Sequence, residues 1–352
     1  MSAVFEPTAP VTRTEERFVF SATGSEYFRI WIVNLLLSIV TLGIYSAWAK
    51  VRRNQYFYAN TKLAGSTFEY HGNPMAILKG RIAAVVLIGG YNLALHYSVK
   101  VGLVMLVVVA AVMPWLILKS LQYSLHNSSY RGIRFGFRGN LKSAYLYYLV
   151  LPVASVFTLG LAYPFVHQRL KQFQHTESRY GTTHFSFDAP VGAFYKAYGV
   201  FIGLLLGGSF ALGIVGAIVG GVSTVMGGGT GKAGVIALIV IVSYGYALCV
   251  GTAFMAYLQN LIWNHTQLGA HGFRSTMTWQ GLAGLLITNL LGIAFTLGLF
   301  IPFAHVRALK YRMQCTAMLV SGSLDDVVAN KGGEVDAIGE GMADLAGFDL
   351  SL

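Results

Sequence analysis

The sequence contains few charged residues, and acidic residues are the scarcest of them. Only 11% of its 352 residues are charged, against about 25% in ordinary soluble proteins. No Asp, Glu, Lys or Arg lies between Lys196 and Lys232, or between Lys232 and Arg274. Each of these stretches exceeds the roughly 20 residues that cross a bilayer. An ordinary soluble domain is therefore excluded, and the composition predicts a polytopic membrane protein.

Other absences exclude further classes of protein. Residues 1–27 lack the apolar segment of a secretory signal, so no cleavable signal is expected. Two cysteines, Cys249 and Cys315, are too few for a disulfide framework. The motifs H-E-x-x-H, G-x-S-x-G and C-x-x-C are missing, and the apolar runs predicted to lie in the membrane contain no carboxylate. We therefore expect no enzyme, no catalytic residues, no metal site and no cofactor.

The net charge of +11 does not by itself predict nucleic-acid binding. Seven of the 14 acidic residues follow residue 324, so the excess of basic charge lies in the rest of the chain. There the basic residues border the apolar runs, where they would face lipid headgroups and fix the orientation. The predicted partners are the lipid bilayer and anionic lipid headgroups, with no nucleic acid; protein partners are not identified.

One motif occurs three times: T-L-G-I-Y-S-A-W-A-K-V-R (41–52), T-L-G-L-A-Y-P-F-V-H-Q-R (158–169) and T-L-G-L-F-I-P-F-A-H-V-R (296–307). In each copy a Lys or His follows the glycine by seven residues and an Arg by nine. Glycine commonly ends a helix and proline commonly starts one, so the motif predicts a helix–turn–helix reversal. The candidate turn residues are Thr41, Gly43, Thr158, Gly160, Thr296 and Gly298.

Short segments of alternating aromatic residues separate the helical parts: F-V-F (18–20), F-E-Y (68–70), F-G-F (135–137), F-S-F (185–187) and a degenerate Gly272-Phe273. Period-two aromatics beside glycine are typical of short strands. The chain is thus predicted to repeat one unit five times: strand, helix, reversal, helix. The predicted fold class is an all-α polytopic membrane protein, with five repeated helical hairpins separated by short aromatic β-strand segments on the cytoplasmic side.

The predicted division of the chain has three parts. A polar N-terminal tail (1–17) precedes an integral membrane domain (18–320), and an acidic cytoplasmic tail (321–352) follows it. The five hairpin repeats are expected at about 18–67, 68–134, 135–184, 185–271 and 272–320.

The basic residues predict the orientation. If every unit is a hairpin, only Lys100 and Lys232 of the 25 basic residues lie on the far side, as the positive-inside rule requires. The strands and both termini are therefore predicted to be cytoplasmic. The nine residues from Gly43 to Arg52 make roughly 14 Å of helix, about half of a bilayer core. The T-L-G turns are thus predicted to be re-entrant, although a full crossing stays open.

At T-L-G-I-Y-S-A-W-A-K-V-R-R (41–53), with F-R-I-W upstream and G-S-T-F-E-Y downstream, the sequence resembles the YjgN-like family of bacterial inner-membrane proteins, a domain of unknown function. The resemblance covers about residues 18–350. It implies a multi-pass inner (plasma) membrane protein, and it brings no catalytic or binding residues with it.

The basic residues of the repeat are the candidate functional residues: Arg52, Arg169, Arg307, Lys50, His167 and His305. In the first interpretation, their long side chains reach the headgroups and anchor the helices. In the second, they contact an anionic solute or a lipid headgroup in a shared cavity. The leading function is a structural or lipid-interacting membrane protein. The alternative is a transporter or channel for a small anionic solute or lipid, through a cavity lined by the T-L-G turns.

Overall fold

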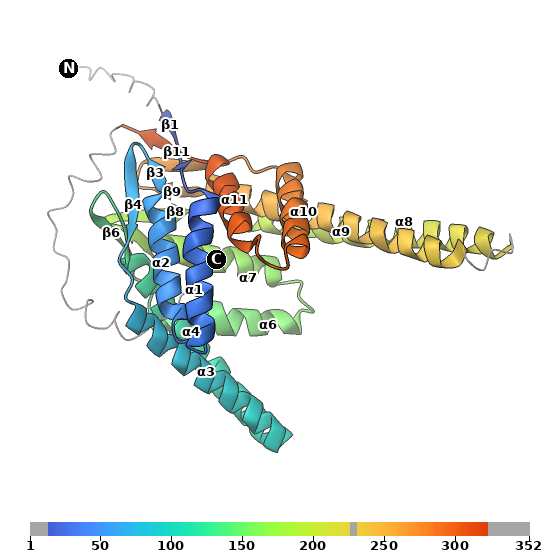
Figure 1. Cartoon of the computed structure of the whole chain (residues 1–352), viewed down its shortest axis with the longest axis horizontal. Helices are drawn as coiled ribbons and strands as arrows, with labels where there is room; N and C mark the ends of the chain where they lie inside the picture. Colours follow the sequence, from blue (N-terminus) through green and yellow to red (C-terminus); the bar gives the residue numbers. More distant parts are fainter. Residues whose placement is uncertain (1–12, 226–230, 323–352) are drawn as a thin grey trace, which may run out of the picture.

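The computed structural model describes residues 13–225 and 231–322 (Figure 1). Its helices are α1 (Gly24–Val40), α2 (Ser46–Ala59), α3 (Pro74–Tyr97), α4 (Val99–His126), α5 (Leu141–Tyr145), the π-helical turn η1 (Leu146–Val150), α6 (Leu151–Phe157), α7 (Tyr163–Thr176), α8 (Val191–Val225), α9 (Gly231–Asn264), α10 (Trp279–Phe295) and α11 (Ile301–Gln314). Its strands are β1 (Arg13–Arg17), β2 (Val19–Phe20), β3 (Thr61–Leu63), β4 (Ser66–Tyr70), β5 (Ser128–Tyr130), β6 (Ile133–Phe137), β7 (Ser178–Tyr180), β8 (Thr183–Phe187), β9 (Thr266–Leu268), β10 (His271–Ser275) and β11 (Thr316–Ser321). The predicted acidic tail lies almost wholly outside the described residues.

The described strands form one 11-stranded antiparallel sheet, in the order β1-β11-β10-β9-β8-β7-β6-β5-β4-β3-β2. Its two ends, β1 and β2, are consecutive parts of one extended segment: β1 pairs with β11, and β2 pairs with β3. The sheet therefore closes on itself like a small barrel. The prediction of an all-α fold is wrong, because the aromatic segments do not stand apart: strands that the sequence analysis did not predict, β3, β5, β7, β9 and β11, pair with them and join them into one sheet. Residues 13–17, predicted as tail, form β1.

Tight turns make this pairing possible. Each aromatic strand after the first is preceded by a three-residue strand, and two residues join them: Ala64-Gly65, Arg131-Gly132, Gly181-Thr182 and Gly269-Ala270. Ala64 and Gly65 have φ values of 44° and 78°. Positive φ at both positions is the mark of the type I′ turn, whose twist matches that of the strands it joins.

A hydroxyl group bonds to the end of the helix that precedes each three-residue strand, and to the end of the helix that precedes β11. The first residue of the strand is Ser or Thr, and its hydroxyl donates to the carbonyl four residues earlier: Thr61, Ser128, Ser178, Thr266 and Thr316. A side chain bonded in this way satisfies one of the carbonyls that the helix end leaves open. Residues close in the sequence therefore determine, in every unit, where the helix ends and the strand begins.

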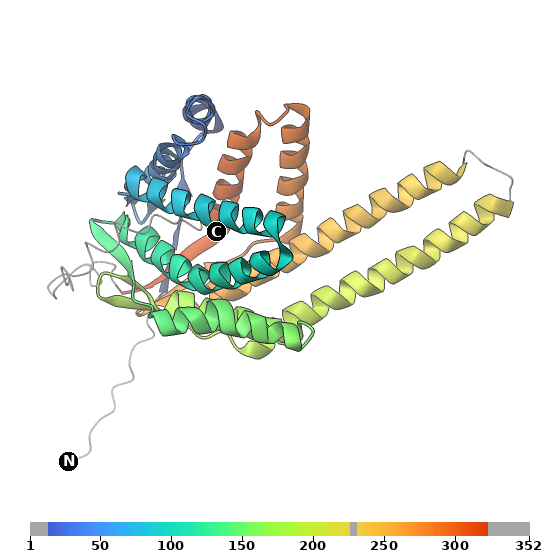
Figure 2. The ribbon, with the colours of Figure 1, turned by 90° about the horizontal axis from the view of Figure 1, so that it is seen from below.

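The antiparallel order places every tight turn at one rim of the sheet and every helix at the other. The paired residues Phe20 and Thr61, for example, both adjoin helices, whereas Arg13 pairs with Ser321 at the opposite rim. Figures 1 and 2 show the helical pairs fanning out from the sheet, with α8 and α9 extending farthest. The first helix of each pair therefore starts, and the second helix ends, at the same rim.

Aromatic side chains fill the sheet. Phe68 stacks on Tyr130 with ring centroids 4.6 Å apart, and Phe135 lies 5.0 Å from Tyr180. The Tyr130 hydroxyl donates to the Leu63 carbonyl at 2.7 Å. Buried aromatics with satisfied hydroxyls make a packed core, so the interior of the sheet is not an open channel.

The helical pairs are of two lengths. The first helix of each T-L-G pair has 17 residues and the second has 14: α1, Leu141–Phe157 and α10, followed by α2, α7 and α11. These lengths correspond to roughly 25 Å and 21 Å, less than a bilayer core of about 30 Å. Among the described residues, four helices are long and apolar enough to cross a membrane: α3, α4, α8 and α9. The prediction of five repeated helical hairpins is therefore wrong, because the helices that could span a membrane number four in the described part of the chain.

Candidate membrane-contacting site

The three T-L-G turns share one pattern of hydrogen bonds. The Thr41 hydroxyl donates to the Leu37 carbonyl at 2.7 Å and accepts from the Tyr45 amide at 2.9 Å. One side chain thus satisfies the end of α1 and the start of the next helix. Thr296 makes the same pair of bonds with Gly292 and Phe300, and Thr158 makes a similar pair with Ala162 and with Ser155, three residues before it instead of four.

A leucine occupies the tip of each turn. Leu42, Leu159 and Leu297 have φ values of 50°, 52° and 50°, in the left-handed region that leucine rarely adopts. Their exposed fractions are 94%, 94% and 95%, the largest of any exposed apolar residue described. The following glycine, such as Gly43 with φ 90°, continues the left-handed turn. Each tip presents an apolar side chain outward while hydrogen bonds satisfy its backbone, as a turn surrounded by lipid requires.

Arg307 is held by its own hairpin. Its guanidinium donates to Asn289 Oδ1 and to Thr288 Oγ1 of α10, each at 2.8 Å, and lies 5.8 Å from the ring centroid of Phe300. Two hydrogen bonds and a cation–π contact fix the side chain across the two helices. The sequence analysis did not predict that Thr288, the neighbour of Asn289 in the chain, accepts a hydrogen bond from Arg307.

The other two arginines differ from Arg307 and from each other. Arg169 donates to Gln172 Oε1 at 2.9 Å, one turn along its own helix, and lies 5.1 Å from the ring centroid of Phe165. Arg52 is exposed. Asn34 precedes Arg52 by 18 residues, the same spacing that separates Asn289 from Arg307. Asn34 is 6% exposed, and its Oδ1 has no hydrogen-bond partner among the described residues.

The remaining candidates also lie in different surroundings. Lys50 is half-buried on α2. His167 Nδ1 is 2.9 Å from the hydroxyl of Tyr198 on α8. His305 is exposed, and its ring centroid lies 6.4 Å from that of Tyr27 on α1. The described contacts therefore do not join the six basic residues of the repeat into one site.

Three tyrosines, which the sequence suggested only as part of an aromatic belt, tie the two helices of a hairpin together. The Tyr311 hydroxyl accepts from the Thr278 amide at 3.2 Å and donates to the Thr278 carbonyl at 3.0 Å. Tyr123 makes the same pair of bonds with Asn73, and Tyr56 makes it with Thr23. Thr23, Asn73 and Thr278 are the N-caps of the first helix of their pairs. The recurring Gln-Tyr pairs at 55–56 and 122–123 were the available signal.

Helical pairs that leave one rim of a closed sheet, two of them long enough to span a bilayer, define a polytopic membrane protein. Residues 15–345 match a family described as Bacterial protein of unknown function (DUF898). The chain is 33% identical over 136 residues to Inner membrane protein YjgN of Salmonella typhimurium (strain LT2). It is 30% identical over 152 residues to the protein of the same name from Escherichia coli (strain K12).

The two alignments cover 38% and 42% of this chain and 34% and 37% of the relatives, so the matched stretches span just over a third of the relatives' length. No solved structure is significantly similar. Because the family match extends over most of the sequence, the chain belongs to this YjgN-like family of membrane proteins whose function is not known. The resemblance drawn from the T-L-G motif is confirmed.

Proposed function

We propose that the protein is a lipid-interacting inner-membrane protein whose three T-L-G hairpins enter the cytoplasmic leaflet and turn back within it. The exposed tip leucines are the observation that carries this proposal. Each of them follows a hydroxyl that satisfies the turn, and each lies ten residues before the arginine of its repeat. The second helix of each pair begins four residues after this leucine, so about 9 Å of helix and the turn itself separate each tip from its arginine, no more than about half of the hydrocarbon core.

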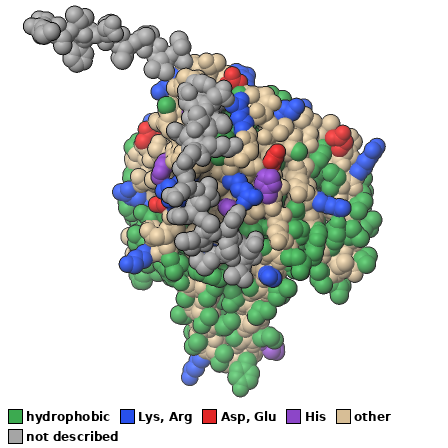
Figure 3. Space-filling model, turned by 90° about the vertical axis from the view of Figure 1, so that its left-hand side faces the viewer, with side chains coloured by type: hydrophobic (Ala, Val, Ile, Leu, Met, Phe, Trp, Pro, Cys, Tyr) green, Lys and Arg blue, Asp and Glu red, His purple; other side chains and the backbone are tan. Residues whose placement is uncertain are grey.

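The distribution of charge supports the cytoplasmic placement of the sheet. In Figure 3, charged side chains gather over the sheet, while the helical pair that protrudes below it is covered mainly by apolar side chains. Lys100, near the start of α4, lies at the far end of a long pair. With the sheet in the cytoplasm, nearly all basic residues lie on the side that the positive-inside rule favours.

Because the hairpins reach only half of the membrane depth, the protein occupies the two leaflets unequally. Three of them add volume to one leaflet, whereas α3, α4, α8 and α9 occupy both. A protein of this shape acts on lipid packing by displacing and binding lipids, without catalysis, a cofactor or nucleic acid. The alternative, a transporter or channel, stays a prediction, and the filled interior of the sheet offers it no path.

Depth-resolved quenching tests the proposal. In a variant without native cysteines, single cysteines at Leu42, Leu159 and Leu297 carry a fluorophore, and nitroxide lipids quench it from known depths. We expect the strongest quenching by nitroxides near mid-membrane, and no reaction with a membrane-impermeant maleimide. A cysteine at Ala64, on the opposite rim of the sheet, should react from the cytoplasmic side. Reaction of the tip cysteines with the impermeant reagent from the periplasmic side would refute the half-depth hairpins.

A further inference from the structure

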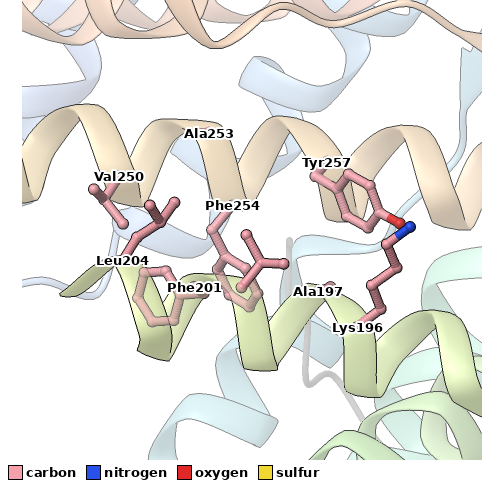
Figure 4. Close-up of a pocket in the computed structure, with 9 residues that line it drawn as sticks. Lys196, Ala197, Phe201, Leu204, Val250, Ala253, Phe254 and Tyr257 are labelled. Carbon is pink, nitrogen blue, oxygen red and sulfur yellow. The ribbon is translucent and has the colours of Figure 1, made fainter. Parts of the chain in front are cut away.

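A groove lies between α8 and α9, near the end of this pair that joins the sheet (Figure 4). Its volume is about 190 Å³, and seven of the nine residues that line it have apolar side chains. The two exceptions are Lys196 and Tyr257, which point toward each other at one end of the groove in Figure 4. The groove is thus an apolar slot with a polar end.

Two aromatic rings form the apolar part. Phe201 of α8 and Phe254 of α9 stack with centroids 4.3 Å apart, and Tyr198 packs edge-on against Phe254 at 4.9 Å. Val200 and Leu204 line the same groove and are 54% and 47% exposed, so the groove opens sideways from the pair. In a bilayer this opening faces lipid.

In the membrane placement proposed above, the polar end lies at the depth of a headgroup. Lys196 is the sixth residue of α8, roughly 8 Å of helix from its start near the sheet, and it is exposed. Within the described part of the chain its ammonium forms no ion pair, and the sequence holds no carboxylate between Asp188 and Asp325. The Lys196 ammonium is a cation at the interface, and the Tyr257 hydroxyl beside it can donate a hydrogen bond.

We propose that this groove binds one anionic phospholipid. The phosphate of the headgroup contacts the Lys196 ammonium and the Tyr257 hydroxyl, and the first part of one acyl chain lies against Phe201 and Phe254. The volume favours this occupant, because pockets that enclose a whole small molecule measure about 300–1,000 Å³. A slot smaller than that, open to the side and apolar, suits a segment of chain. The inference deepens the proposed lipid interaction and rests on it.

Crosslinking of the full-length protein in nanodiscs tests the site. The probes are phosphatidylglycerol and phosphatidylcholine that carry the same diazirine-labelled acyl chain. We expect phosphatidylglycerol to crosslink to residues 197–204 and 250–257, more strongly than phosphatidylcholine. The substitution Lys196→Gln should reduce the phosphatidylglycerol signal roughly fivefold, which is the effect of one interfacial cation, and leave phosphatidylcholine unchanged.

A matched variant separates a site from general interfacial charge. Lys79 is also an exposed sixth residue of a long helix, α3, and it does not line this groove. Lys79→Gln should leave the crosslinking at α8 and α9 unchanged. An equal loss with both variants, or a loss with neither, overturns the proposal.

A variant that fills the groove completes the test. Ala253→Phe should abolish crosslinking of both lipids there while the protein keeps its oligomeric state. If it instead separates protomers, the occupant is a second copy of the chain, and the lipid site is wrong. Quenching at Leu42 should not change with Lys196→Gln, so failure of the groove is distinguishable from failure of the half-depth hairpins.

Discussion

Substitution of Thr296 by valine removes a hydroxyl and keeps the shape of the side chain. The hydroxyl donates to the Gly292 carbonyl at 2.7 Å and accepts from the Phe300 amide at 2.9 Å. The Gly292 carbonyl still accepts from the Thr296 amide at 3.1 Å, but the Phe300 amide loses its acceptor. The main consequence is one backbone donor without a partner at the tip of the hairpin.

The size of the effect depends on what surrounds the tip. In water the free amide finds a new partner, and the net loss is about 1 kcal/mol. In lipid it finds none, and the loss of an acceptor for a buried donor adds about 1–3 kcal/mol. We therefore expect Thr296→Val to lower the free energy of unfolding by about 2–4 kcal/mol in nanodiscs. That corresponds to a fall in Tm of roughly 4–8 °C at about 2 °C per kcal/mol.

The matched control is Thr296→Ser, which keeps the hydroxyl and should leave Tm within about 2 °C of the parent. Thermal unfolding in nanodiscs, followed by circular dichroism, measures both variants. A fall of less than 2 °C for the valine variant would mean that water reaches the turn. The reasoning about half-depth hairpins would then be refuted at this tip.

Two further predictions concern buried or half-buried polar side chains. Asn289→Leu removes an acceptor from Arg307 and should lower the free energy of unfolding by about 1–2 kcal/mol, whereas Asn34→Leu removes an unpartnered carbonyl and should be neutral or stabilising; equal losses of Tm would contradict this. Burial, and secondarily the charge of Lys171, lowers the pKa of His175 to about 4 from 6.5. Its protonation therefore favours the unfolded chain, so stability is full above about pH 6.5 and falls by about 2–3 kcal/mol toward pH 4. In melts between pH 7.5 and 4.5, His175→Gln should remove this loss, and an unchanged pH profile would contradict it.

The local parts of the fold were predictable because the residues that form them are neighbours. The reversal at T-L-G follows from a glycine that ends one helix, and the structure confirms a left-handed Gly43 there. The closed sheet was missed because its strands come from distant units and have only two to six residues each. The dipeptides Ala64-Gly65 and Arg131-Gly132 could have indicated β-hairpins. However, they lack the Asn or Asp that usually precedes the glycine in a hairpin turn.

The arginines show where a repeat in sequence stops predicting contacts. Arg307 faces Thr288-Asn289, which offer two oxygen acceptors. At the same spacing before Arg52 the chain has Val33-Asn34, and before Arg169 it has Val150-Leu151. The arginine of each copy therefore faces a different pair of side chains on the preceding helix. Because the motif does not include that helix, it does not predict the contacts of the arginine.

The geometry of the sheet explains why the helical pairs separate as they do. Neighbouring strands lie about 4.8 Å apart, so a unit that contributes two strands occupies roughly 10 Å of the rim. One helix with its side chains is about 10–12 Å wide, and each unit must seat two at this rim. The two helices of a unit are together wider than the two strands that carry them, so the pairs lean outward, as Figures 1 and 2 show. In the proposed placement in the membrane, the divergence of the pairs away from the rim leaves each T-L-G tip, and the groove between α8 and α9, open to lipid.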